Sequence, residues 1–123
     1  MMERKLTITT KTDWKTALRS AGSMASVGLQ HGKYQGEALN FETPGDFFVH
    51  LTPNRWAMIS EMQGAGEVGV RELGRRLGRD VKRVHEDAAA LVELGLLQRS
   101  ESGALICPYT DIHVDMHMVK KAA

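Results

Sequence analysis

The sequence predicts an α+β fold, a winged helix-turn-helix with an N-terminal strand and helix extension. Three observations predict it. A capped helix, a short helix, a tight turn and a longer helix follow one another within residues 52–95. A hairpin with a glycine near its tip comes next, and Leu6 and Ile8 alternate with threonines near the start of the chain. We expect residues 1–43 to be the extension and residues 44–123 the winged helix-turn-helix.

Composition favours one folded domain in a reducing compartment. The chain has 123 residues, and 42% of them are hydrophobic, which is enough for one core. Its formal net charge is +1, so no global field attracts it to nucleic acid or to a membrane. Cys107 is the lone cysteine, and the sequence shows no signal-peptide pattern and no run of eighteen apolar residues. We expect a cytoplasmic protein without membrane association.

The N-terminal part alternates short elements. Lys5 to Thr10 has the period-2 pattern of a strand with one buried face. Asp13 is expected to cap a helix that runs until Gly28 and Gly32 weaken it, and Gly36 to Thr43 includes a brief extended segment. Pro44 then opens a short helix that carries Phe47, Phe48 and Leu51.

Three helices are predicted in the second half of the chain. Thr52 and Pro53 give the first an N-cap and an N1 proline, and a second, short helix stops at Gly78. Asp80 caps the third, which Gly95 ends. The first helix is expected to bury Trp56, Ile59 and Met62, with Met58 as a further candidate. The third is expected to bury Val81, Val84, Ala88, Leu91 and Val92.

Strands are predicted after the third helix. Leu96 to Arg99 and Ala104 to Cys107 are joined by Ser100 to Gly103, which is typical of a hairpin and would form the wing. After Pro108 the apolar residues alternate with polar ones from Ile112 to Met118, which predicts a further strand. Its partner is either the N-terminal strand or a second copy of the chain.

Positive charge is concentrated around the predicted turn. Residues 71–83 contain six basic and two acidic residues, a local charge of +4 in a nearly neutral chain. Such charge neutralises phosphates, and the start of a recognition helix adds N–H groups aimed at phosphate. The expected DNA contacts are Arg71, Arg75, Arg76, Arg79, Lys82, Arg83, Glu86 and Arg99.

These contacts divide by their place on the helices. Lys82, Arg83 and Glu86 lie away from the buried stripe and can reach base edges, with Arg83 the first choice for a guanine. Arg75, Arg76 and Arg79 suit phosphate contacts that set the register, and Arg99 is a further phosphate candidate at the base of the wing. Helix pairs with basic faces also occur in proteins that never bind nucleic acid.

Two acidic residues accompany the basic ones. Glu86 and Asp87 put negative charge on or near the expected reading helix. This fits either recognition of a cytosine or a salt bridge to Lys82 or Arg83 at helical spacing, and the sequence does not decide between them.

A family resemblance depends on two segments, LTPNRWAMISEMQGAG and VRELGRRLGRDVKRVHEDAAALVELGLLQR, which are followed by a hairpin and by IHVDM. Residues 41–118 resemble a family of small prokaryotic winged-helix DNA-binding regulators related to the MarR-like group. Members are often encoded beside a TumE-type toxin. The resemblance implies that some act as its antitoxin and as autorepressor of the pair.

One group of side chains suggests metal chemistry. His113, Asp115 and His117 lie on one face of the last predicted strand and offer two imidazoles and a carboxylate, although the solvated face of any strand alternates in this way. Cys107 is expected to be a buried structural thiol. The sequence has no phosphate-binding loop, nucleophile elbow or paired carboxylates, so we expect neither an enzyme nor a bound cofactor.

These features support three hypotheses. The first is a homodimeric repressor that binds double-stranded DNA. The second is a protein-interaction module that neutralises a partner toxin, and the third is a metal-responsive repressor that depends on the histidines. The apolar residues Leu6, Ile8, Trp14, Phe41, Phe47 and Phe48 exceed what a lone winged helix needs, which predicts an interface.

Overall fold

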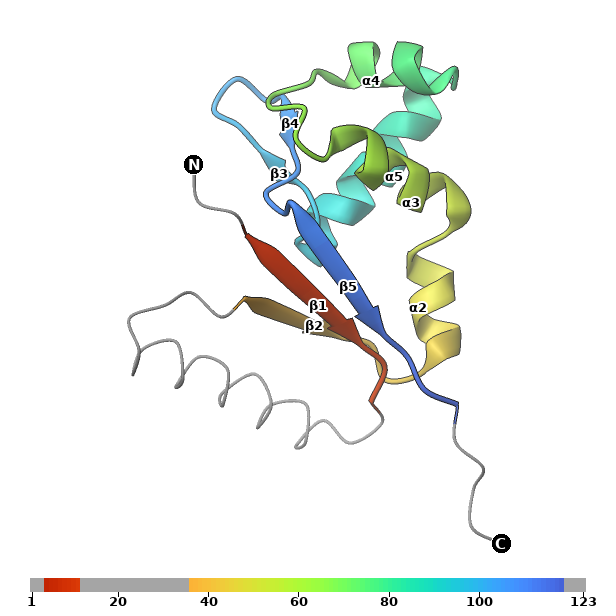
Figure 1. The fold of residues 1–123 in the computed structure, drawn as a ribbon. Coiled ribbons are helices and arrows are strands. Elements are labelled where there is room, and N and C mark those ends of the chain that lie inside the picture. Colours follow the sequence, from red (N-terminus) through yellow and green to blue (C-terminus); the bar gives the residue numbers. More distant parts are fainter. Residues whose placement is uncertain (1–3, 12–35, 119–123) are drawn as a thin grey trace, which may run out of the picture. The chain divides into compact units, whose positions relative to one another are not determined.

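A computed structural model describes residues 4–11 and 36–118 as a mixed α+β structure (Figure 1). The expected α+β class is thus confirmed. The chain divides into two compact units, which are described separately below. The first consists of Met1–Val49 together with Asp111–Ala123, and the second is His50–Thr110. The helix expected to start at Asp13 lies outside the described residues.

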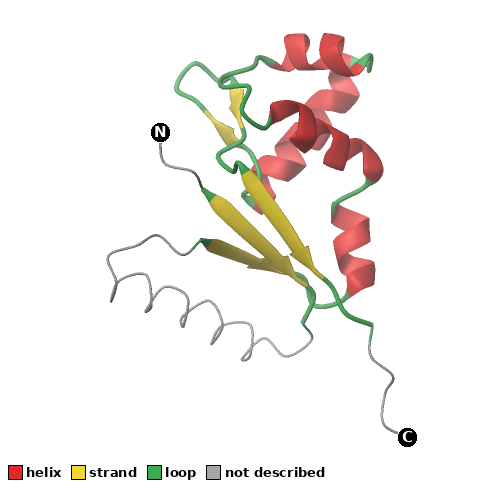
Figure 2. Cartoon of the chain, in the orientation of Figure 1, coloured by secondary structure: helices red, strands yellow, loops and turns green. Residues whose placement is uncertain are grey.

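The first unit contains a three-stranded parallel sheet in the order β2-β1-β5, drawn yellow in Figure 2. Its strands are β1 (Lys5–Thr9), β2 (Glu37–Asn40) and β5 (Asp111–Asp115). Ile8 of β1 is fully buried and pairs with a residue of each neighbouring strand. The predicted first strand is confirmed, and the N-terminal strand is the partner of the last one.

Helix α2 (Pro44–His50) follows β2 and begins at the proline, as predicted. Phe47 is buried and meets Phe41 edge to face, with ring centroids 5.7 Å apart. Phe48 and Val49 point outward instead and are 60% and 70% exposed. One turn of this helix therefore presents apolar surface to solvent.

The second unit begins with helix α3 (Pro53–Met62), which has the predicted cap. The Thr52 hydroxyl oxygen accepts a hydrogen bond from the backbone N–H of Arg55. Met58, Ile59 and Met62 are buried, but Trp56 is 38% exposed, so its expected place in the core was wrong. A helix can bury one stripe only, and the stripe of α3 is centred on the two methionines and Ile59.

Helices α4 (Val70–Leu77) and α5 (Val81–Leu94) are joined by a tight turn. Gly78 ends α4 with a φ of 64°, a conformation that favours glycine, and the Asp80 side chain accepts from the backbone N–H of Arg83 to cap α5. The turn passes close to α4 at Gly74, because a Cβ added at Gly74 would lie 3.3 Å from the carbonyl oxygen of Arg79.

The core stripe of α5 is narrower than expected. Val84, Ala88 and Leu91 are fully buried. Val81 is 42% exposed, which corrects its predicted burial, and Val92 is half-buried. Val81 is the first residue of α5, where the helix leaves the turn at the surface, so spacing alone overestimates its burial.

A small antiparallel hairpin follows α5, with strands β3 (Gln98–Arg99) and β4 (Leu105–Ile106). Gly103 near its tip has a φ of 87°, as the turn prediction requires. The strands are shorter than expected, but Val68 exchanges two backbone hydrogen bonds with Leu105, of 2.9 and 2.8 Å. Val68 thus lies against the hairpin.

The division into units differs from the expected boundary between residues 43 and 44. Strand β5 pairs with β1 along its whole length, so the C-terminal strand groups with the N-terminal sheet. Most of α2 belongs there as well. Among the described residues, no helix is both long and apolar enough to cross a membrane.

Candidate nucleic-acid interface

The first turns of α3 and α5 line an open groove of about 670 Å³ in the second unit. Both N-cap residues, Thr52 and Asp80, are among its walls. Backbone N–H groups at the start of a helix carry partial positive charge and favour anions. The residues that line the groove are Thr52, Asn54, Arg79, Asp80, Lys82, Arg83, Glu86 and Asp87.

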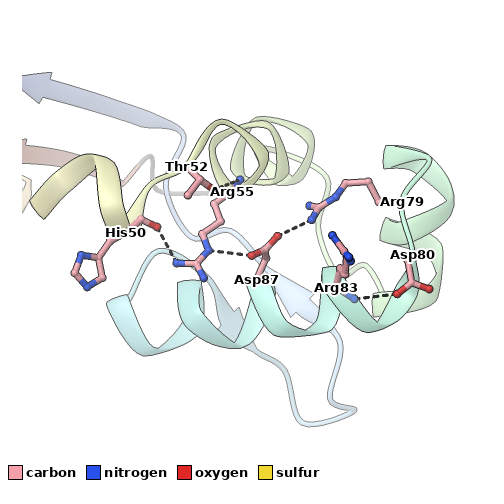
Figure 3. A network of polar contacts seen from close by, with 7 residues as sticks. All are labelled: His50, Thr52, Arg55, Arg79, Asp80, Arg83 and Asp87. Atoms are coloured by element: carbon pink, nitrogen blue, oxygen red, sulfur yellow. Dashed lines mark hydrogen bonds and ion pairs between the residues drawn. The ribbon is translucent and has the colours of Figure 1, made fainter. Parts of the chain in front are cut away.

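An ion-pair network centred on Asp87 includes two of the lining residues, Asp87 and Arg79 (Figure 3). Its Oδ1 accepts from Arg55 Nε at 3.0 Å, and its Oδ2 accepts from Arg79 Nη2 at 2.7 Å. Arg55 also donates from Nη1 to the backbone oxygen of His50 at 2.9 Å. One carboxylate therefore links α3, the turn before α5, and α5 itself.

The network is largely shielded from water. The side chains of Arg55, Asp87 and Arg79 are 23%, 17% and 20% exposed. Partial burial raises the pKa of the Asp87 carboxyl, but the hydrogen bonds from Arg79 and Arg55 outweigh it and hold this pKa below its ordinary value. Arg79 was expected to contact phosphate; its guanidinium faces Asp87 instead.

A second cluster neutralises part of the positive charge on α4. Glu72 accepts from Arg75 Nε at 2.9 Å and from Arg76 Nε at 3.1 Å. These hydrogen bonds lower the pKa of Glu72 from 4.5 to about 2, and the bond to Glu72 raises the pKa of Arg75. Arg75 stays 74% exposed. Both arginines are thus on the surface, with one carboxylate shared between them.

Three basic residues of the predicted set are unpaired in the described part of the chain. Arg71, Lys82 and Arg83 are exposed, and none of them forms an ion pair with another described residue. Figure 3 shows the Arg83 guanidinium outside the Asp87 network, while its backbone N–H bonds to Asp80. Lys82 and Arg83 line the groove, whereas Arg71 does not.

The sequence left open whether Glu86 forms a salt bridge to Lys82 or Arg83. It is exposed and lines the groove, and within the described residues it makes no salt bridge to Lys82 or Arg83. Its neighbour Asp87 is the acid that pairs, and it pairs with arginines from other segments.

The remaining expected contacts lie outside the groove. Arg99 is exposed in β3 and donates from Nη1 to the Gly103 carbonyl at 3.4 Å. Arg75 and Arg76 also do not line the groove. Lys82, Arg83 and Glu86 were predicted to lie on one exposed face of the helix, and all three line the groove.

Asn54, which lines the groove, and Arg55, which does not line it but holds Asp87, are absent from the predicted contacts. Asn54 follows the N1 proline of α3, and Arg55 one position later holds Asp87. Their neighbours come from α5, about thirty residues further along the chain, so no local pattern identifies them. The cap signal at Thr52 located the start of α3, which was the available clue.

The suggested metal group does not assemble in the described residues. No three His, Cys, Asp or Glu side chains there form a cluster able to hold a metal ion. Strand β5 ends at Asp115, so His117 is not on its face, and His117 Nε2 lies 2.8 Å from an Asp115 oxygen. Cys107 is half-buried, and burial raises the pKa of its thiol.

The family comparison covers the whole second unit. A family model named HVO_A0114 matches residues 50–114, which is just over half of the chain. No curated protein and no solved structure matches. The name of the family states no activity. By this match, the chain belongs to the HVO_A0114 family.

Proposed function

We propose that the second unit, residues 50–110, is a winged helix-turn-helix that binds double-stranded DNA, and that the protein is a transcriptional regulator. The observation that carries the proposal is a pair of cations, Lys82 and Arg83, on the exposed first turn of α5, which form no ion pair with another described residue. Cations left without partners beside two helix N-termini favour a polyanionic ligand.

The order of elements supports this kind of domain. A helix, an extended segment at Val68, two helices joined by a tight turn and a hairpin follow one another, which is typical of winged helices. In this arrangement α5 is the recognition helix and the β3–β4 hairpin is the wing. α4 then lies across the DNA backbone.

The charges of the domain suggest a division of labour on DNA. Arg83 has a planar guanidinium that matches the O6 and N7 acceptors of a guanine. Lys82 and Arg71 are free to contact phosphate, as are Arg75 and Arg76 on their exposed sides and Arg99 on the hairpin. Arg79 contributes by positioning the turn through Asp87.

The test is binding to a selected duplex. From a randomised duplex pool at low salt, the wild type should enrich a preferred site, and Arg83→Ala should bind that site about tenfold or more weakly. Arg83→Lys keeps the charge but loses the planar fork, so it should keep non-specific affinity and lose preference. Unchanged melting temperatures would exclude misfolding as the cause.

Glu93→Gln is the matched control on the same helix, because Glu93 is exposed and does not line the groove. It should bind like the wild type. If no duplex is enriched, or if Arg83→Ala binds the enriched site as tightly as wild type, the assignment to DNA binding is wrong.

We further propose that the regulator acts as a homodimeric repressor, because dimers bind inverted half-sites through two recognition helices. The exposed Phe48 and Val49 on α2 support a contact with a second copy. Sedimentation at tens of micromolar should give a dimer, and Val49→Lys should shift it toward monomer. A wild-type monomer would contradict this proposal.

The same apolar turn favours a second candidate function, capture of a small partner protein, with neutralisation of a toxin as its sharpest form. In that case wild-type protein sediments as a monomer alone but forms a complex with the product of a neighbouring short gene. Val49→Lys should then weaken that complex and leave DNA binding intact.

A further inference from the structure

Glu86 and Asp87 are consecutive acids of α5 in opposite situations. Asp87 is 17% exposed, and both of its carboxylate oxygens accept from arginines of other segments. Glu86 is exposed in the groove without an ion pair among the described residues. Asp87 therefore has a structural role, while the fold gives no reason for an acid at position 86.

The helix itself gains little from Glu86. Acidic side chains stabilise the first turn of a helix, where the N-terminal dipole acts, but α5 begins at Val81 and its cap is Asp80. Lys82 and Arg83 are spaced for helical ion pairs with Glu86, yet neither forms one. On a face that binds phosphates, an unneutralised carboxylate also lowers non-specific affinity.

The groove is lined by charged side chains of both signs, whereas a site for phosphate alone needs cations only. Arg79 is paired with Asp87, and Asp80 is engaged as the helix cap. Among the described residues that line the groove, Lys82 and Arg83 are then the cations without an ion pair, and Glu86 is the acceptor without one. Donors and an acceptor on one face are what the mixed edges of bases require.

An ionised carboxylate accepts hydrogen bonds and does not donate them. In the major groove, adenine shows its N6 donor beside the N7 acceptor, which repels a carboxylate, whereas cytosine shows the N4 amino donor. We propose, on the basis of the DNA-binding function argued above, that Glu86 is a specificity-determining residue that accepts a hydrogen bond from the N4 amino group of a cytosine.

Arg83 fixes where this cytosine lies. It precedes Glu86 by three residues, which is about 4.5 Å along a helix axis, and base pairs follow each other roughly every 3.4 Å. The two side chains therefore read adjacent or next-adjacent base pairs. The half-site contains a guanine contacted by Arg83 and, one or two pairs away, a C·G pair contacted by Glu86.

The experiment compares full-length wild type, Glu86→Ala and the matched control Glu93→Ala on the duplex that the wild type selects. Each C·G pair of the site is mutated in turn, and each cytosine is also replaced by N4-methylcytosine, which still pairs with guanine. Affinities are measured by fluorescence anisotropy on these duplexes and on an unrelated duplex, and melting temperatures are recorded for each protein.

For wild type and Glu93→Ala, mutation of one particular C·G pair should weaken binding at least about fivefold, and methylation of its cytosine should weaken it too. Glu86→Ala should be indifferent to both changes at that pair. It should also bind the unrelated duplex as tightly as wild type or more tightly. A structural role alone would not remove one preference while leaving the affinity for the unrelated duplex equal or higher.

Equal preference profiles for Glu86→Ala and wild type overturn the inference and leave the proposed function standing. A uniform loss of affinity on all duplexes, with a lowered melting temperature, overturns it in the same way. If wild type binds no duplex at low salt, the proposed function fails, and this inference fails with it.

Discussion

The charged residues on and around α4 and α5 include two groups that behave differently. In the paired group, Asp87 holds Arg55 and Arg79, and Glu72 holds Arg75 and Arg76. In the unpaired group, Arg71, Lys82, Arg83 and Glu86 are exposed and form no ion pair within the described residues. A local charge of +4 over residues 71–83 therefore overstates the charge available to a ligand, because the acid that pairs with Arg79, Asp87, lies outside the counted range.

The largest expected effect comes from removing the centre of the paired group. Asp87→Ala leaves Arg55 and Arg79 partly buried without a countercharge, which should lower the free energy of unfolding by about 2 kcal/mol after allowance for partial exposure. Urea unfolding at neutral pH measures it. Glu93→Ala, on the exposed part of the same helix, should change stability by no more than about 0.5 kcal/mol.

Equal urea midpoints for these two variants would contradict this prediction, because the Asp87 network would then contribute no stability. Loss of stability with a retained site preference would instead show that the network is purely structural. Residual DNA binding by folded Asp87→Ala protein then reports how far the network positions α5.

A smaller effect is expected on the stability of the protein at acidic pH. The pKa of Glu72 is lowered from 4.5 to about 2, and the pKa of Asp87 is lowered as well. A carboxyl with a depressed folded-state pKa stabilises the fold above its ordinary pKa and loses this contribution as the pH falls through the folded-state value. Stability should therefore decrease between about pH 4.5 and pH 2.

Glu72→Gln should flatten this decrease, since the variant has no carboxyl to protonate at that position. Thermal melts in steps of pH measure the slope, and Glu93→Gln should follow the wild-type curve. Parallel curves for wild type and Glu72→Gln would show that the Glu72 pairs contribute nothing to the acid response.

Local signals predicted much of the second unit. Thr52 and Asp80 cap their helices, and Gly78 and Gly95 end theirs in the left-handed region, as the sequence indicated. Caps and C-terminal glycines act within a few residues, so their effect can be predicted without knowing the fold. Trp56 and Val81 were misjudged because periodicity does not say which stripe of a helix faces its neighbours.

Contacts between distant parts of the chain could not be predicted from local sequence signals. Parallel pairing of β1 with β5 joins residues more than a hundred positions apart, and no turn residue specifies it. Likewise, Arg55 meets Asp87 only because α3 packs against α5. The exposed face of α5 could be predicted from the sequence. The pairing of its charges could not, because it depends on contacts with other segments.

The most direct test of the account is the salt dependence of duplex binding. The logarithm of the wild-type association constant should fall linearly with the logarithm of salt concentration. Lys82→Ala combined with Arg83→Ala should weaken binding and reduce the slope by about one to two, more than Arg75→Ala combined with Arg76→Ala, whose charges Glu72 partly neutralises. Absence of wild-type binding at low salt, or an unchanged slope in the Lys82 and Arg83 variant, would contradict the account.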